Sequence, residues 1–313
     1  MVIYIVSDGK KGHLSQTRGL AEALCRQAKE LSPGLECQYH EVDISGKSLL
    51  TRLFYKGEEL ELPRPDLILC AGHRTHLPAL SLARHFRCLC MVCMKPSLPM
   101  SLFDLCIVPR HDLPDEEVTG NHIFRTVGAL NSIRPCPDAE KRETLILIGG
   151  PSKEFGWDAE MILTQLGTIA RNSTSPMVLT TSRRTPQDFA QDVAAVCPSI
   201  RVEPVESTGP TWVVDHLASA REVWVTQDSV SMVYEALSSG APVGILDMPR
   251  KKNQQGAPLS RVARGLRMLI DDGSVCTFTE WARTHTLPHS APLLQEADRT
   301  AAHILSRFPS LLS

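Results

Sequence analysis

The chain has 313 residues, of which 42% are hydrophobic and 22% are charged. This composition is typical of a soluble globular protein, and the length favours two domains over one. The formal net charge of −2 argues against nucleic acid or an anionic membrane surface as the main partner, because both require a basic excess. No apolar run approaches the roughly 20 residues of a membrane span.

The N-terminus reads Met-Val-Ile-Tyr-Ile-Val and lacks the basic start and the cleavage site of a signal peptide, so it indicates a first strand and a cytoplasmic protein. Most of the ten cysteines lie in apolar contexts, which favours reduced thiols. These cysteines include Cys70, Cys88, Cys90, Cys93 and Cys106. Cys90 and Cys93 form a C-x-x-C pattern inside a strand-like run, without a second pair at zinc spacing. We therefore expect no metal site and no cofactor.

Strand and helix patterns alternate through the first half of the chain. The expected strands are 2–6, 37–42, 65–71, 88–94 and 103–108. The first helix has apolar residues that step by three and four, and Pro33-Gly34 ends it. Those apolar residues are Leu20, Ala21, Leu24, Ala28 and Leu31. A second helix is expected over 77–86.

Two loops at strand ends in this half contain residues suited to a binding site. The candidates are Asp8, Gly9, Gly12 and His13 in the first loop, and Gly72 and His73 in the loop Gly72-His-Arg-Thr-His76. Glycine lets the backbone turn tightly and approach a ligand, and Asp8 and His13 place an acid and a base at the end of the first strand. The alternative is that these glycines meet a purely steric need, because every strand-to-helix turn is tight.

A polar segment broken by two prolines, 134–141, marks the domain linker. After it we expect strands 144–148, 177–181 and 200–205 and helices 158–171 and 257–268. A last helix, 291–307, has an apolar side made of Leu294, Ala297, Ala301, Ile304 and Leu305, and we expect it to brace the first domain. The expected divisions are 1–138, 139–288 and, for this helix, 289–313.

The stretch from Thr226 to Ile245 predicts a strand, a tight turn, a helix and a second strand. The helix has an apolar face formed by Val230, Val233, Tyr234 and Leu237. The amides of Ser229, Val230 and Ser231 in its first turn are suited to phosphate oxygens, and Glu235 is placed to accept hydrogen bonds from a sugar. The alternative is that Asp228 or Ser229 merely caps a structural helix.

Two further loops add candidates in this half. Gly149 and Gly150 follow strand 144–148, and Arg183 and Arg184 follow strand 177–181. A guanidinium matches phosphate oxygens, so the arginines are natural counter-charges for a diphosphate. An arginine pair also occurs in solvated loops. The run Arg250-Lys-Lys-Asn253 adds positive charge at another strand end.

These patterns predict an α/β fold of two Rossmann-like domains that face each other across a cleft. The sequence also resembles the mitochondrial-fission elongated-mitochondria family in several motifs that occur in order. The motifs are Ser7-Asp-Gly through His13 and Gln16, Lys95-Pro-x-Leu-Pro with Phe103-Asp-Leu, Pro109-x-His-Asp112, Thr181-Ser-Arg-Arg-Thr-Pro186, and Thr226-x-Asp-Ser-Val-Ser-Met-x-x-Glu-Ala. Bacterial members of that family are described as glycosyltransferases or nucleoside-diphosphate-sugar epimerases.

The resemblance implies a GT-B-like fold, as in the lipid-linked N-acetylglucosamine transferase of peptidoglycan synthesis and the non-hydrolysing UDP-N-acetylglucosamine 2-epimerase. In those enzymes a Ser/Gly-rich turn that opens a helix, followed by a glutamate, binds the donor diphosphate and ribose. The matching residues here are Ser229, Val230, Ser231 and Glu235. Ser-Val-Ser replaces the paired glycines of those enzymes, which implies a phosphate that lies further out or is held less tightly.

We therefore expect a metal-independent inverting glycosyltransferase that uses a nucleotide-diphosphate sugar and an unknown acceptor. A lipid-linked acceptor would bring peripheral membrane contact. In this hypothesis the helix amides and Arg183 or Arg184 stabilise the leaving diphosphate, and His13 or Asp8 deprotonates the acceptor. One alternative is an epimerase that uses Asp104, His111 or Asp112, and another is a non-catalytic adaptor related to mitochondrial-fission factors.

Overall fold

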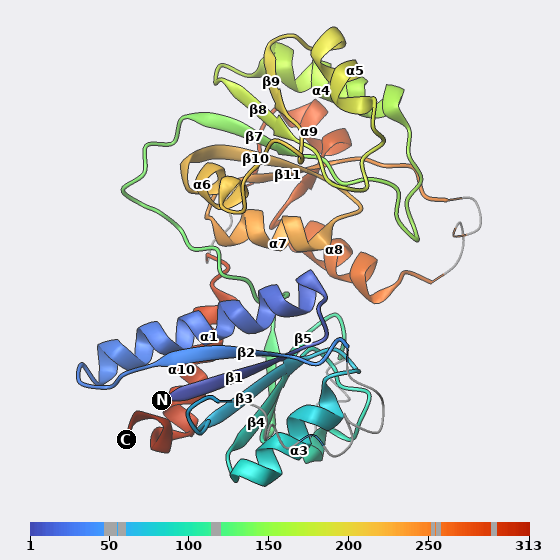
Figure 1. The fold of residues 1–313 in the computed structure, drawn as a ribbon. Helices are drawn as coiled ribbons and strands as arrows, with labels where there is room; N and C mark the ends of the chain where they lie inside the picture. Colours follow the sequence, from blue (N-terminus) through green and yellow to red (C-terminus); the bar gives the residue numbers. More distant parts are fainter. Residues whose placement is uncertain (47–54, 56–60, 114–119, 252–253, 255–257, 289–292) are drawn as a thin grey trace. The chain divides into compact units, whose positions relative to one another are not determined.

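The computed structural model describes residues 1–46, 55, 61–113, 120–251, 254, 258–288 and 293–313. The chain divides into two compact α/β units (Figure 1). Unit 1 contains Met1–Ser132 together with Gln295–Ser313, and unit 2 contains Ile133–Leu294. The chain therefore leaves unit 1, completes unit 2 and returns to unit 1.

The sheet of unit 1 has six parallel strands in the order β2-β1-β3-β4-β5-β6. The strands are β1 (Val2–Ser7), β2 (Gln38–Asp43), β3 (Leu67–Ala71), β4 (Leu89–Cys93), β5 (Leu105–Pro109) and β6 (Ile123–Thr126). The strands β1, β3, β4 and β5 are buried almost throughout, as continuous apolar runs covered on both faces require. Because all strands are parallel, their carboxyl ends meet at one edge of the sheet.

Helices cover both faces of this sheet. They are α1 (Lys11–Leu31), α3 (His76–Phe86) and α10 (Glu296–Arg307), with the short 3-10 turns η1 (Met100–Leu102) and η4 (Pro309–Leu312). The helices α1 and α10 pack on one face, where Leu20 and Leu24 share a buried cluster with Ile304. The helix α3 packs on the other face through Ala79 and Leu82.

The sheet of unit 2 also has six parallel strands, in the order β12-β11-β10-β7-β8-β9. The strands are β7 (Glu143–Leu147), β8 (Met177–Thr180), β9 (Ile200–Glu203), β10 (Ala220–Thr226), β11 (Val243–Leu246) and β12 (Cys276–Thr277). In this order β10 lies between β7 and β11, so loops far apart in sequence meet at the carboxyl edge. Gly244 in β11 is needed because a side chain there would overlap the ring of Trp224.

The helices of unit 2 are α4 (Ala159–Asn172), α5 (Phe189–Val196), α6 (Trp212–Ser219), α7 (Val230–Ser238), α8 (Arg261–Asp271) and α9 (Phe278–Thr284). The helices α4, α5 and α9 pack on one face of the sheet, and α7 and α8 lie on the other (Figure 1). Side chains of Asp158, Ser260 and Thr277 cap α4, α8 and α9 by accepting a backbone N–H.

Several expectations about local structure require correction. Among the helices and strands that the structure describes, the sequence patterns missed β6, α5, α6, β12 and α9. Leu31 is 64% exposed, because it lies in the last turn of α1 beyond the sheet. Leu294 precedes α10, which begins at Glu296. The helix expected over 257–268 begins at Arg261, and residues 252, 253 and 257 of the expected basic run and helix lie outside the described residues.

The expectation of reduced thiols is wrong for one pair of cysteines. Cys25 in α1 and Cys37 just before β2 form a disulfide. The five cysteines singled out in the sequence are free thiols. Burial raises the pKa of Cys93 and Cys106, so these thiols are held protonated and unreactive. No helix in the described ranges has the length and apolar character needed to cross a membrane.

Candidate functional site

The carboxyl edge of unit 2 gathers most of the residues suggested by the sequence. The strands β7, β8 and β10 are neighbours or next neighbours in the sheet. Their ends lead into the Gly149-Gly150 turn, the Arg183-Arg184 loop and the start of α7. Ligands of open parallel sheets bind at this edge.

The start of α7 is open. Ser229 is the N-cap, but its side chain makes no capping hydrogen bond, and its amide donates to the carbonyl oxygen of Thr226 at 3.3 Å. In the part of the chain that the structure describes, the amides of Val230, Ser231 and Met232 have no acceptor. The first turn of α7 contains no acidic residue. These amides and the helix dipole therefore favour an anion, and Ser229 does not act as a side-chain cap.

The apolar face expected for α7 is confirmed. Val230, Val233, Tyr234 and Leu237 are all buried, and Ser231 is exposed. The helix is thus fixed to the sheet by one face, and its first turn lies directly after β10.

Asp228 has a different role from the expected cap or ligand contact. Its side chain has no exposed surface, and its Oδ2 forms an ion pair with Arg184 Nη1, 2.7 Å away. The same oxygen accepts the amide of Gly150 at 3.1 Å. Asp228 therefore joins the loop after β8 and the turn after β7 to the start of α7.

The two amides of the Gly149-Gly150 turn donate hydrogen bonds within the protein and are not free to bind a ligand. The amide of Gly149 donates to Thr226 Oγ1 at 2.7 Å, and that of Gly150 donates to Asp228. A side chain at Gly149 would overlap the Asp228 carboxylate, and one at Gly150 would overlap the carbonyl oxygen of Arg184. Both glycines are therefore required for close packing, and their amides are occupied by Thr226 and Asp228.

The two arginines differ. Arg184 is anchored by Asp228 and by the carbonyl oxygens of Gly150 and Pro151, at 3.2 and 3.3 Å from Nη1. Arg183 is exposed, and among the described residues it has no polar contact. Only Arg184 is held in one orientation without a ligand.

Glu235 lies one turn further along α7. Burial raises the pKa of this carboxyl to about 7. Among the described residues it has no hydrogen-bond or ion-pair partner. Glu235 is half-buried, and a partly desolvated carboxylate without a partner is costly, so such groups are enriched at functional sites where a ligand can supply the missing donors.

The carboxyl edge of unit 1 contains the expected acid and base. His13 Nδ1 lies 3.0 Å from Asp8 Oδ1, and the Asp8 side chain is fully enclosed. Burial raises the pKa of Asp8, but hydrogen bonds from His13 and the Lys10 amide, together with the charges of these two residues, lower it below its usual value. Asp8 is therefore ionised and orients the imidazole of His13, so that the other ring nitrogen, Nε2, is left to exchange a proton.

The glycines of this edge have separate roles. Gly9 and Gly72 adopt left-handed backbone conformations, with φ of 79° and 89°. A side chain at Gly72 would also overlap the His13 ring, so Gly72 provides the space that the base occupies. Gly12 is exposed in the first turn of α1 and has open space around it, and His73 is exposed.

Three further residues lie near this dyad, and of these His76 belonged to a motif that the sequence had singled out. His76 is buried. Its burial, and to a smaller extent the charges of the nearby His73 and His13, lower its pKa to about 4, so the ring is neutral. Its Nδ1 lies 3.3 Å from Ser97 Oγ. Met94, at the end of β4, has a φ of 73°, which is strained for a residue with a side chain. Only the second histidine of the motif after β3 signalled this group.

The acid and base considered for an epimerase are separated by the fold. Asp104 precedes β5 and accepts the amide of Cys90 at 2.8 Å, so it lies at the amino edge of the sheet. His111 and Asp112 follow β5 at the carboxyl edge, with His111 Nε2 3.9 Å from Asp112 Oδ1. Asp104 is therefore excluded from the site at the carboxyl edge.

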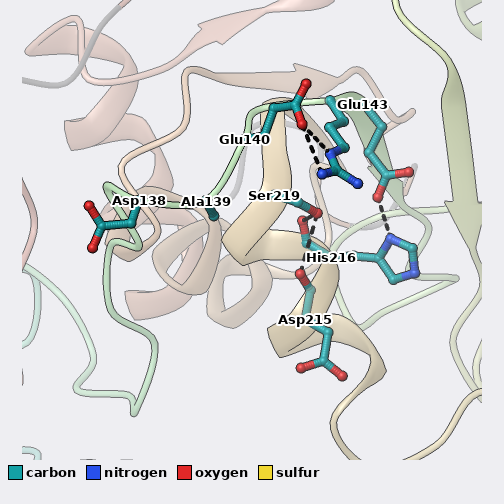
Figure 2. Close-up of a pocket in the computed structure, with 8 residues that line it drawn as sticks. Asp138, Ala139, Glu140, Glu143, Asp215, His216 and Ser219 are labelled. Carbon is teal, nitrogen blue, oxygen red and sulfur yellow. Dashed lines mark hydrogen bonds and ion pairs between the residues drawn. The ribbon is translucent and has the colours of Figure 1, made fainter.

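The amino edge of unit 2 contains a pocket of about 580 Å³ that no sequence pattern indicated. It is lined by residues before and at the start of β7 and by one side of α6, namely Asp138, Ala139, Glu140, Arg142, Glu143, Asp215, His216 and Ser219. Figure 2 shows Glu143 directed at His216, and the two side chains form a hydrogen bond. The ring of Trp212 stacks on that of His216 with centroids 3.9 Å apart. The pocket lies at the ends of β7 and β10 opposite to Gly149 and Ser229, so it is separate from the candidate site.

No group of three or more histidine, cysteine or acidic side chains suited to a metal ion occurs within the described ranges.

Comparison with known proteins identifies a family that matches most of the chain. The model of a family described as mitochondrial fission ELM1 matches residues 11–308. An uncharacterised protein of Rickettsia prowazekii (strain Madrid E), RP120, is 28% identical, over 80% of this chain and 84% of the relative. The UDP-GlcNAc 2-epimerase of Methanocaldococcus jannaschii is similar in structure, with a TM-score of 0.54 at 13% identity, over 98% of this chain and all of the other. AviGT4, a glycosyltransferase involved in avilamycin A biosynthesis, has a TM-score of 0.50 at 14% identity, over 100% of this chain and 98% of the other. These similarities concern the fold, and they confirm the expected GT-B-like pair of Rossmann-like domains.

Proposed function

The chain belongs to the mitochondrial fission ELM1 family, and we propose that it is a glycosyltransferase that uses a nucleotide-diphosphate sugar. The observation that carries this proposal is the open first turn of α7 with an anchored guanidinium and an unpartnered carboxylate beside it. Amides and Arg184 suit the two phosphates, and Glu235 suits the hydroxyls of the ribose. The shared fold with a sugar-nucleotide epimerase and a glycosyltransferase supports the same class of ligand.

The chemistry assigned to unit 2 is stabilisation of the leaving group. In an inverting transfer the acceptor oxygen attacks the anomeric carbon as the bond to the diphosphate breaks. Negative charge then grows on the diphosphate, where the amides of Val230 and Ser231 and the Arg184 guanidinium offset it. These groups are in place before the reaction, so little reorganisation is needed when the charge appears.

The chemistry assigned to unit 1 is removal of the acceptor's proton. His13 is the base, and Asp8 fixes its Nδ1 and stabilises the imidazolium that forms. Gly72 keeps the space for the ring. Because the carboxylate of Asp8 is enclosed, we assign it the role of orienting His13 and assign His13 the contact with the acceptor.

A thermal-shift titration of the full chain tests the proposal. UDP- or GDP-sugars should raise the unfolding midpoint, and Glu235→Ala and Arg184→Ala should each reduce that rise, because binding to the folded state alone stabilises it. Glu206→Ala is a matched control, since Glu206 is an exposed carboxylate of the same unit. If neither class of nucleotide sugar shifts the midpoint of the wild-type chain, the proposal is wrong.

An epimerase is the second candidate, because His111 and Asp112 lie as an acid-base pair at the carboxyl edge that also holds His13. Incubation with a nucleotide sugar alone separates the two reactions. An epimerase converts the sugar, whereas a transferase without acceptor leaves it largely intact. A non-catalytic adaptor is a third outcome, in which alanine at Glu235 and Arg184 leaves the cellular role unchanged.

A further inference from the structure

The carboxylate of Asp228 is enclosed at the centre of the candidate site. Its side chain has no exposed surface, and Oδ2 makes both contacts, to Arg184 Nη1 and to the Gly150 amide. Its Oδ1 has no hydrogen-bond partner among the described residues. A carboxylate held in this way does not reach a ligand at the start of α7, so its effect on that ligand must pass through Arg184.

Arg184 uses one end of its guanidinium for all of its described contacts. Nη1 bonds to Asp228 and to the carbonyl oxygens of Gly150 and Pro151. A guanidinium has five N–H donors in a rigid fork, so Nε and Nη2 remain as donors. The side chain is 45% exposed. The anchored end therefore fixes the direction of the free end.

We propose that Asp228 is a positioning residue that holds Arg184 ready to bind a diphosphate through Nε and Nη2. The inference rests on the proposed function and narrows it. Arg184, rather than its neighbour Arg183, is the guanidinium that contacts the diphosphate. Asp228 itself contacts the arginine and not the ligand.

Asp228 has two opposing effects on a bound anion, so the change in anion affinity on its replacement shows which effect dominates. The negative charge of Asp228 repels a bound anion, so removing it favours binding by simple electrostatics. Loss of the ion pair also leaves the Arg184 side chain free to move. Binding must then order this side chain, and the lost conformational entropy weakens the affinity for the anion. Positioning predicts weaker anion binding in Asp228→Asn, and charge repulsion alone predicts tighter binding.

Gly149 provides a second route to the same perturbation. A side chain at this position would overlap both oxygens of the Asp228 carboxylate. Gly149→Ala thus displaces the carboxylate without removing any charge from the chain. The matched control is Gly209→Ala, because Gly209 lies in the same unit and a side chain there would meet nothing within 4 Å.

The test is calorimetric binding of inorganic pyrophosphate and of UDP to the full chain at one ionic strength. Asp228→Asn, Gly149→Ala and Arg184→Lys should each weaken both ligands about tenfold, the effect of losing one charge-assisted hydrogen bond. In the background of Arg184→Ala, Asp228→Asn should cause no further loss. Asp247→Asn is the control for the carboxylate, because Asp247 follows β11 in the same sheet and contacts Thr279 rather than an arginine.

The outcomes separate this inference from the proposed function. Weaker pyrophosphate binding in the three variants supports the inference, whether or not a nucleotide sugar binds. If no nucleotide sugar binds, only the proposed function is wrong. UDP binding that is equal or tighter in folded Asp228→Asn and Gly149→Ala overturns the inference and leaves the proposed function in place. Absence of pyrophosphate binding to the wild-type chain also overturns it. If Asp228→Asn does not fold, as judged by circular dichroism, Gly149→Ala and Arg184→Lys decide the question.

Discussion

Glu235→Gln removes a carboxylate whose ionisation the fold opposes. Burial raises the pKa of Glu235 from 4.5 to about 7. The folded protein therefore holds this proton more tightly than the unfolded chain, and the unfolding free energy of the wild type should fall as pH rises from 4.5 towards 7. A shift of this size corresponds to at most about 3 kcal/mol at pH above 7. Glutamine carries no such cost, so the variant should gain stability relative to the wild type over that interval.

Urea unfolding of both proteins at several pH values measures this difference. The free energy of the variant minus that of the wild type should rise between pH 4.5 and about 7 and stay constant above it. A pH-independent offset from burying the amide does not change the slope. Parallel pH profiles for the two proteins would refute the account of Glu235 as a carboxylate whose pKa is raised by burial.

Ligand binding gives a second readout of the same group. If the ribose hydroxyls donate to Glu235, they favour its ionised form, so UDP binding should release a proton near pH 6 to 7. The wild type should bind UDP more tightly as pH rises through this range. Glu235→Gln should retain only the smaller dependence that comes from the phosphate of UDP itself, and calorimetry in buffers of different ionisation enthalpy measures the proton directly.

Three further results are expected. His13→Gln should lower the rate of sugar transfer by about 10²- to 10⁴-fold and leave UDP affinity unchanged, because UDP is assigned to unit 2; a normal rate would exclude His13 as the base. Gly72→Ala should reproduce this loss and destabilise the fold by roughly 1–3 kcal/mol, because Gly72 has a φ of 89° and adjoins the His13 ring; Gly12→Ala, with open space around it, should do neither. Reduction of the Cys25–Cys37 disulfide should lower the unfolding free energy by about 3 kcal/mol, measured as a lower melting midpoint in reductant, with no such change in a chain with serine at both positions.

The features that the sequence predicted well depend on neighbours along the chain. The stripe of α7 from Val230 to Leu237 follows from helical spacing, and the buried strand β3 follows from one apolar run. The proximity of Asp8 and His13 also has a local origin, because one loop and one turn of helix separate them.

The features that it missed depend on partners distant in sequence. Asp228 looks like a cap before a helix, and only the strand order β10-β7-β8 brings Arg184 to it. A glycine pattern such as Gly149-Gly150 indicates that another group lies close to the backbone. It does not show whether that group is a ligand or, as here for Gly149, a carboxylate of the protein. Spacing likewise did not distinguish the bridge between Cys25 and Cys37 from two free thiols.

The route of the chain through the two units affects how the protein is made. The helix α10 belongs to the core of unit 1 but is synthesised after the whole of unit 2. During translation unit 2 can complete its sheet and both helical layers while the α1 face of unit 1 still lacks Ala301 and Ile304. A premature stop ahead of Glu296 would therefore expose an apolar helix face at the opposite end of the sequence and mark the truncated product for aggregation or proteolysis.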